Sequence, residues 1–244
     1  MASLGNVALI AGRELKSYRR SPLGAIVVSG MLLMSGILFY IFGLSADRLL
    51  SAEVLRQFFY NASGPLMIAC PLLSMRLVAE ERQTGTLTLL NTSPVTDGQI
   101  VLGKFLSALC VISLATVLTA YMPALIFVNG KVSVGHILVG YLGLLLLGSA
   151  AMSIGLFAST LARSQVVAVV ITALILGPMV TLWLLAKVTE PPLNSFLGAL
   201  SLHHDNFKPF MDGVLKLDAV AYYLAVTTFF LLAATKVLEA RRWR

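Results

Sequence analysis

The stretch MRLVAEERQTGTLTLLNTSPVTDGQIVLGK, residues 75–104, is the long polar segment around which this chain is organised. It carries charges of both signs and joins two segments that lack Asp, Glu, Lys and Arg, residues 57–75 and 105–130. Since a bilayer core of roughly 30 Å needs about 20 mostly apolar residues in a helix, each neighbour is long enough to cross a membrane. The polar stretch is therefore expected to connect two membrane spans on one side.

The composition of the whole chain is that of an integral membrane protein. Of its 244 residues 58% are hydrophobic and 12% are charged, and the mean hydropathy is +0.88. These values lie far from those of soluble domains. Six segments of 17 residues or more are free of charged side chains: 21–46, 57–75, 105–130, 132–162, 164–186 and 219–235. We predict an all-α, polytopic fold with six transmembrane helices in a single domain over 1–244.

The expected division of the chain follows from these segments. We predict an interfacial helix over 1–22, spans over 23–44, 57–79, 99–129, 134–162, 164–187 and 219–237, a cytoplasmic coupling segment over 80–98, and an outer re-entrant segment over 188–218. The last is too apolar in its middle for a solvated loop, and non-helical backbone at membrane depth is tolerated only beside protein or a water-filled cavity. It is therefore a candidate lining for an outer exit, through Phe196, His203, His204, Phe207, Phe210 and Gly213.

The distribution of charge predicts the orientation. With both termini on one side, that side holds twelve of the eighteen basic residues against five acidic ones, a net charge of +7. The other side holds six of each sign. Because Lys and Arg are retained in the cytoplasm, both termini are expected there, in a multi-pass protein of the inner (plasma) membrane. The basic excess implies contact with membrane lipid and does not imply nucleic acid.

The N-terminal residues predict an amphipathic helix. Val7, Ile10, Ala11, Leu15 and Tyr18 fall on one helical face, and the basic residues of the segment lie mainly on another. This pattern is typical of a helix in the membrane interface. The alternative is a solvated basic tail that only orients the protein.

The predicted spans contain two packing signals. Pro65 and Pro71 predict a bend in the second span, either a gating hinge or a site where neighbouring helices satisfy the freed carbonyls. Gly148, Ala151, Gly155 and Ser159 place small residues along one face of the fourth span and predict close helix contact there. That contact is expected within one chain, and contact between two copies is the alternative.

Residues 80–98 predict a rigid connector. Gly85 is expected to end the helix that continues from the second span, and a short leucine-rich helix is expected to stop before Pro94. Thr96-Asp97-Gly98-Gln99 predicts a capping box that opens the third span. Such a unit can pass a push from a docked partner to two spans, whereas the alternative is a solvated hairpin. The residues expected to carry this coupling are Glu80, Glu81, Arg82, Gly85, Thr86, Leu87, Leu89, Leu90 and Pro94.

Two patterns resemble chemical sites without meeting their requirements. Gly98–Lys104, GQIVLGK, fits the start of a phosphate-binding loop, but Phe105 stands where a Ser or Thr must reach Mg²⁺, and no strand precedes it. His203, His204 and Asp205 include metal-ligand residue types, but two adjacent histidines do not make a site, so packing is favoured over metal binding. We expect no catalytic residue, metal or cofactor in this chain.

The chain resembles the ABC-2 type exporter permeases. AEERQTGTLTLLNTSPVTDGQIVLGK matches the acidic helix end, Gly-Thr, leucine-rich helix and Pro turn that follow their second span. The basic start with Tyr18-Arg19-Arg20-Ser21-Pro22 and the bulky outer segment extend the likeness over the whole chain. Around residues 201–224 it is similar to the gliding-motility-associated and nitrous-oxide-reductase-maturation branch, through Phe207, Phe210, Gly213, Tyr222 and Tyr223.

This resemblance implies a permease subunit of an ATP-driven exporter. Its expected partners are ABC ATPase subunits that bind ATP and Mg²⁺, and a second permease copy or paralogue, with an auxiliary outer protein as a further candidate. The absence of charged residues from the six segments disfavours transport driven by protons or ions. Two alternatives stay open: a non-transporting membrane scaffold that anchors an ATPase, and a membrane enzyme with an outer-facing site at His203, His204 and Asp205.

Overall fold

The computed structural model describes residues 2–44, 51–85, 95–129 and 132–242, and its regular structure there is entirely helical. The helices are α1 (Ala2–Arg20), α2 (Pro22–Phe39), a π-helical turn η1 (Tyr40–Leu44), α3 (Ser51–Ser74), α4 (Arg76–Gln83), α6 (Asp97–Leu118), α7 (Tyr121–Asn129), α8 (Val134–Leu161), α9 (Gln165–Val188), α10 (Leu193–Leu200), α11 (His204–Met211) and α12 (Leu217–Arg242). Six helical stretches are long and apolar enough to cross a membrane: Pro22–Gly43, Ser51–Gln83, Asp97–Ile126, Val134–Leu161, Gln165–Val188 and Leu217–Arg241. The predicted all-α, six-span class is confirmed.

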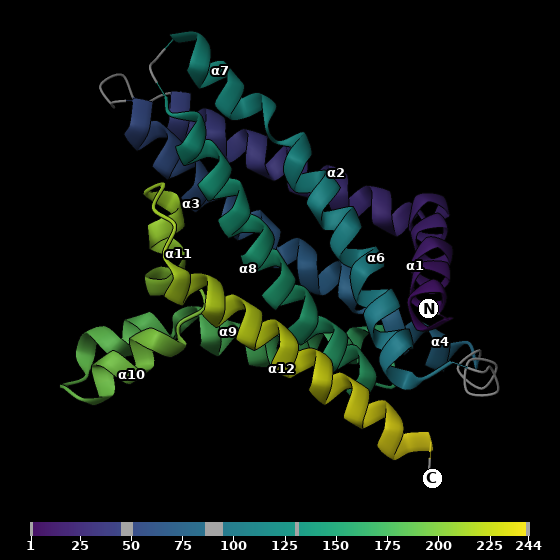
Figure 1. Ribbon diagram of the computed structural model, residues 1–244. Helices are drawn as coiled ribbons and strands as arrows, with labels where there is room; N and C mark the ends of the chain where they lie inside the picture. The colour runs from purple at the N-terminus through teal and green to yellow at the C-terminus, as the bar shows by residue number, and fades with distance from the viewer. Residues whose placement is uncertain (1, 45–50, 86–94, 130–131, 243–244) are drawn as a thin grey trace.

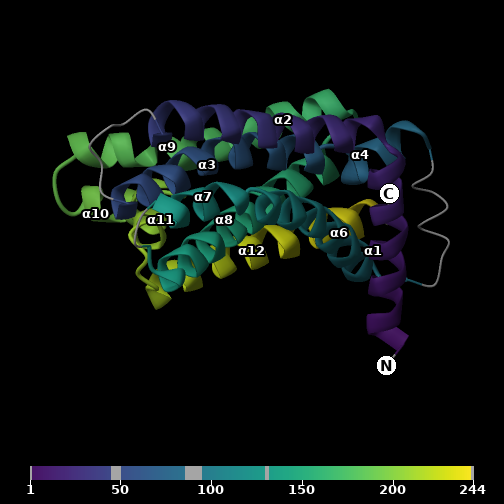
Figure 2. The same ribbon diagram turned by 90° about the horizontal axis from the view of Figure 1, so that it is seen from above.

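The long helices form a bundle whose centre is α8 (Figure 1). Helix α8 packs against α3, α6, α9 and α12, and its C-terminal half is almost wholly buried. Helix α1 lies crosswise to the others at one end of the bundle (Figure 2), and both chain termini lie at that end. Helices α10 and α11 lie at the opposite end. We call these the inner end and the outer end.

Small residues allow the central helices to touch. A Cβ atom added to Gly155 would lie 1.8 Å from the Ser74 Oγ, and one added to Gly140 would lie 2.2 Å from the Phe59 ring. The Ser159 hydroxyl accepts hydrogen bonds from the backbone N–H groups of Val78 and Ala79 at 3.1 and 3.0 Å. The small face of α8 therefore packs within the chain, as expected.

Prolines of the second and third predicted spans differ in their effect. Helix α3 continues through Pro65 and Pro71, and a break follows at Met75, between α3 and α4. The bend predicted at these two prolines stays a prediction. The third predicted span, 99–129, is interrupted between Leu118 and Tyr121. Pro123 accounts for this interruption, because a proline ring collides with the carbonyl four residues earlier and ends a helix there.

Other boundaries differ at the ends of elements. Helix α3 begins at Ser51, within residues that were expected to form a loop before a span over 57–79. The Arg56 guanidinium lies 3.0 Å from the Asp212 carboxylate, which ties the start of α3 to the end of α11. The segment 188–218 contains two short helices, α10 and α11, and its predicted re-entrant position in the membrane stays a prediction.

Candidate functional site

The connector over 80–98 is bounded by two signals that the sequence predicts. Helix α4 ends at Gln83, and Gly85 has a positive φ of 74°, a conformation that favours glycine. At the other boundary the Thr96 side chain accepts from the Gln99 N–H, while the Gln99 side chain accepts from the Thr96 N–H. The predicted capping box is thus confirmed. Thr86, Leu87, Leu89, Leu90 and Pro94 lie outside the described residues.

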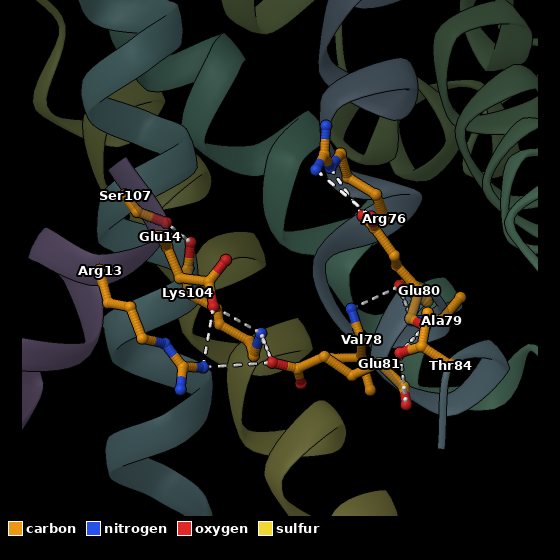
Figure 3. A network of polar contacts seen from close by, with 11 residues as sticks. Arg13, Glu14, Arg76, Val78, Ala79, Glu80, Glu81, Thr84, Lys104 and Ser107 are labelled. Carbon is orange, nitrogen blue, oxygen red and sulfur yellow. Dashed lines mark hydrogen bonds and ion pairs between the residues drawn. The ribbon is translucent and has the colours of Figure 1, made fainter. Parts of the chain in front are cut away.

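A cluster of charged side chains joins three helices directly beside this connector (Figure 3). The Lys104 ammonium of α6 lies 2.8 Å from Glu81 Oε1 of α4 and 3.1 Å from Glu14 Oε1 of α1. Arg13 of α1 lies 3.3 Å from the Glu14 carboxylate and 3.4 Å from that of Glu81. We call these four residues the inner charge cluster.

Because the inner charge cluster is buried, it restricts the positions of α1, α4 and α6 relative to one another. The Lys104 side chain is only 1% exposed, and those of Glu14 and Glu81 are 15% exposed. Removing one partner from such a buried arrangement leaves a charge without compensation, which costs about 3–5 kcal/mol. The three helices are therefore held in one relative arrangement.

A second group of contacts attaches the end of α1 to the break between α3 and α4. The Tyr18 hydroxyl donates to the Leu73 carbonyl at 2.8 Å, and the Arg76 guanidinium lies 5.3 Å from the centre of the Tyr18 ring. Arg76 also pairs with Glu80 at 2.9 Å and donates to the Ser21 hydroxyl. Burial raises the pKa of Tyr18 well above its usual range, so the phenol stays neutral and keeps donating.

The predicted coupling residue Arg82 is used inside the chain. Its guanidinium donates to the carbonyls of Ala162 and Thr160 at 2.7 and 3.3 Å, and Arg241 of α12 donates to that of Leu161 at 3.0 Å. These carbonyls end α8, where a helix leaves its last acceptors without partners and attracts positive charge. Helix α4 and helix α12 are thereby each connected to the end of α8.

A polar pocket of about 310 Å³ opens between α1 and α4. Its lining combines cations and carboxylates: Arg13, Glu14, Ser17, Tyr18, Arg76, Leu77, Glu80, Glu81, Thr84 and Lys104. Gly98–Lys104 lies within α6, so the described part of the chain lacks the strand, loop and helix of a nucleotide-binding loop. At the inner end, side chains of opposite charge pair between helices, an arrangement suited to a mechanical connection.

The predicted outer residues separate into core and surface. Phe207 and Phe210 are fully buried, and Gly213 has a positive φ of 72°. Phe196 is 62% exposed on α10. The structure therefore does not bring Phe196 together with the buried members of the set.

The two adjacent histidines have different partners. The His203 Nε2 lies 2.7 Å from the Ser63 Oγ, and its ring stacks on Phe207 at 5.3 Å between ring centres. Burial, with a smaller contribution from His204, lowers the pKa of His203 to about 4. His204 stacks on Trp183 at 4.4 Å. Both rings pack against aromatic side chains, and no group of three or more potential metal ligands occurs among the described residues.

Sequence reasoning identified Glu81 but missed its partners. Lys104 is a single charge in the first turns of a predicted span, and a charge in that position needs a partner. Glu14 is the one acidic residue in the basic N-terminal segment 2–20. Lys104 and Glu14 each differ in charge from the residues around them in the sequence. That difference was the signal from which their pairing could have been predicted.

A large part of the chain matches a known protein family. Residues 13–179 match a family model described as "ABC-2 family transporter protein". The match covers more than half of the chain, including the inner charge cluster and the connector. No curated protein matches.

Proposed function

The chain belongs to the ABC-2 transporter family, and from that premise we propose that it is the permease subunit of an exporter driven by separate ATPase subunits. A second permease copy or paralogue completes the substrate path in this proposal. ATP and Mg²⁺ bind to the ATPase partner. Both termini and the connector over 80–98 face the cytoplasm, in keeping with the net charge of +7 on that side.

The observation that carries this proposal is the position of Lys104. Its ammonium contacts carboxylates from α1 and α4 at 3.1 and 2.8 Å while it belongs to α6. The connector joins α4 to α6, so a force applied to it reaches both spans and, through Glu14, the crosswise helix α1. A solvated hairpin would not need a buried ion cluster at its base.

The internal contacts divide the coupling residues into two roles. Glu81 and Arg82 hold α4 against α6 and α8, so their role is to position the connector. Thr84 and Gly85 lie within the connector and are exposed. The leucines at 87, 89 and 90 are proposed to contact the ATPase. At the opposite end, residues 191–216 are proposed to border the exit.

The first experiment asks whether an ATPase docks on the connector. A photo-crosslinking amino acid is placed at Leu89 in the full chain and activated in cells. We expect it to capture a protein that carries the ATP-binding motifs of an ABC ATPase. The matched control places the same amino acid at Phe196, which is 62% exposed at the outer end, where no ATPase is expected.

The result separates the proposed function from its alternatives. Capture of an ATPase from Phe196 and not from Leu89 would overturn the assignment of the connector and of the orientation. If an ATPase is captured from Leu89, Glu81→Gln in the purified complex then tests coupling, because it removes the charge of Glu81 and leaves Glu14 beside Lys104. An exporter should lose cargo-dependent stimulation of ATP hydrolysis with the complex intact, whereas a scaffold would show no such stimulation in either form.

A further inference from the structure

An apolar groove of about 390 Å³ lies between α1, α2 and α6, away from the inner charge cluster. Its walls include Leu15 of α1, Val28 of α2, and Val111, Leu114 and Leu118 of α6. Among the residues that line it, only Arg19 is charged. The groove therefore has an apolar body and one cationic member at α1.

Small side chains create this groove on the α2 side. Gly24, Ala25 and Ser29 line it, and Tyr18 packs so closely that its carbonyl lies 2.8 Å from where a Gly24 Cβ would be. Opposite them, Leu114 and Leu118 remain 62% and 50% exposed. Since these residues belong to predicted membrane spans, the groove opens toward lipid.

The cationic rim of the groove is Arg19, one member of a row on α1 whose other members, Lys16 and Arg20, line a separate pocket. Lys16, Arg19 and Arg20 are exposed, and residues three or four apart on a helix are neighbours on its surface. Glu14, the one acidic residue between positions 2 and 20, is turned away and contacts Lys104 at 3.1 Å. The carboxylate that could neutralise this row is therefore engaged elsewhere.

The position of α1 places this rim at headgroup depth. Helix α1 lies across the ends of the spans (Figure 2), so it runs parallel to the membrane plane if the spans cross the bilayer. Basic residues at the cytoplasmic surface attract anionic lipid with about 1 kcal/mol each. An apolar groove that begins at a cation suits one lipid molecule, with an acyl chain in the groove and an anionic headgroup at the cation.

We infer that this groove binds an anionic phospholipid. The phosphate lies against Arg19, and one acyl chain lies between α2 and α6 along Val28, Val111 and Leu114. A zwitterionic lipid fits the apolar part equally well but does not compensate the row of cations. The site would fix the depth of α1, and it does not depend on the direction of transport or on the ATPase.

The test measures lipid association at the groove itself. Trp183 and Trp243 are replaced by Phe in the full chain, and L114W places a fluorescent reporter on the groove wall. The protein is reconstituted in phosphatidylcholine bilayers that contain increasing fractions of phosphatidylglycerol or phosphatidylcholine with brominated acyl chains, which quench tryptophan. We expect brominated phosphatidylglycerol to associate about fivefold more strongly, the factor that about 1 kcal/mol gives.

A matched reporter distinguishes a built site from general attraction to the membrane surface. L174W places tryptophan on α9, where Leu174 is 69% exposed outside the groove. We expect no preference between the two lipids there. An equal preference at both positions would overturn the proposal, as would the absence of any preference at position 114.

Charge variants test the rim. R19Q should abolish the fivefold preference at L114W, whereas R19K should keep it. A preference that survives R19Q would overturn the assignment of an anionic headgroup to this groove. If L114W does not fold, as judged by circular dichroism, L118W reports from the same wall. Failure of both brominated lipids to quench either reporter would show that protein fills the groove, for instance a second copy, and would overturn the lipid assignment.

Discussion

The two ends of the bundle are held together by different kinds of contact. At the inner end, buried ion pairs join α1, α4 and α6 around Lys104. At the outer end, the ion pair between Arg56 and Asp212 is exposed. Aromatic rings pack around Phe207 and Phe210 in the interior, and neutral hydrogen bonds fix the backbone, such as that from the Tyr223 hydroxyl to the Leu202 carbonyl at 2.8 Å. Ion pairs depend on partner geometry and charge, whereas aromatic packing depends on shape. The inner end is therefore the one suited to respond to a docked partner.

The largest expected effect comes from removing the centre of the inner charge cluster. Lys104→Ala should lower the free energy of unfolding by about 3–5 kcal/mol, because the buried carboxylates of Glu14 and Glu81 would keep only Arg13, whose side chain is 62% exposed, as a cation. Thermal unfolding of the purified chain measures the loss. The control is Lys236→Ala, whose side chain is 75% exposed in its pair with Glu239 and should contribute about 0–1 kcal/mol.

A companion variant separates charge from packing at the same place. Replacing Lys104 by Met together with Glu14→Gln and Glu81→Gln removes all three charges, and stability should then return to within about 1–2 kcal/mol of the original chain. If the triple variant were as unstable as Lys104→Ala, the inner end would depend on packing rather than on ion pairing. The comparison between the two ends would then fail.

The next effect concerns pH at the outer end. Burial lowers the pKa of His203 to about 4 from 6.5, so in the folded chain the ring stays neutral while the unfolded chain takes up a proton. Stability should therefore fall as the pH decreases from about 6.5 to about 4, by roughly 3 kcal/mol in all. Unfolding curves at several pH values measure this decrease. In His203→Gln the decrease should be smaller, and an unchanged profile would contradict the assignment.

A smaller effect tests shape at the outer end. Gly143→Ala should lower the free energy of unfolding by about 1–3 kcal/mol, because overpacking forces neighbouring groups to move. A Cβ atom at this position would lie 2.4 Å from the Phe210 Cβ. Gly177→Ala is the matched control on α9, where the added atom meets nothing within 4 Å, and it should stabilise by about 0.5–1 kcal/mol. Equal melting temperatures for the two variants would argue against tight packing here.

The smallest effect comes from one neutral hydrogen bond. Tyr223→Phe removes the buried bond to the Leu202 carbonyl and should cost about 1 kcal/mol. Tyr222→Phe removes a bond to the Leu200 carbonyl at 2.7 Å in an exposed position, where the carbonyl is not enclosed by protein, so its cost should be lower. Chemical denaturation of the two variants gives the difference, and a larger loss for Tyr222→Phe would contradict this ordering.

Signals local in sequence gave much of the fold. Length and apolar composition were sufficient for six spans, and the capping box at Thr96 and Gln99 was sufficient for the start of α6. Small residues on α8 indicated the face that packs. Each of these features acts within a few residues or along one helix, so it can be recognised without knowing what lies opposite.

Features that depend on distant partners could not be obtained in this way. Lys104 and Glu14 are 90 residues apart, and nothing in either neighbourhood specifies the other. Phe207 and Phe196 are both aromatic residues of the outer segment, yet one is buried and the other is exposed. The family match ends at residue 179, so the branch suggested by the residues around Phe207 and Tyr223 stays a prediction.

The hydroxyl of Ser159 has a consequence for movement. It accepts from the N–H groups of Val78 and Ala79 and donates to the Met75 carbonyl at 2.9 Å, at the point where α3 ends and α4 begins. A tilt of α4 alone would break all three bonds, at about 1 kcal/mol each. In the proposed coupling, a displacement of α4 would therefore be shared with α8, the longest described helix of the bundle.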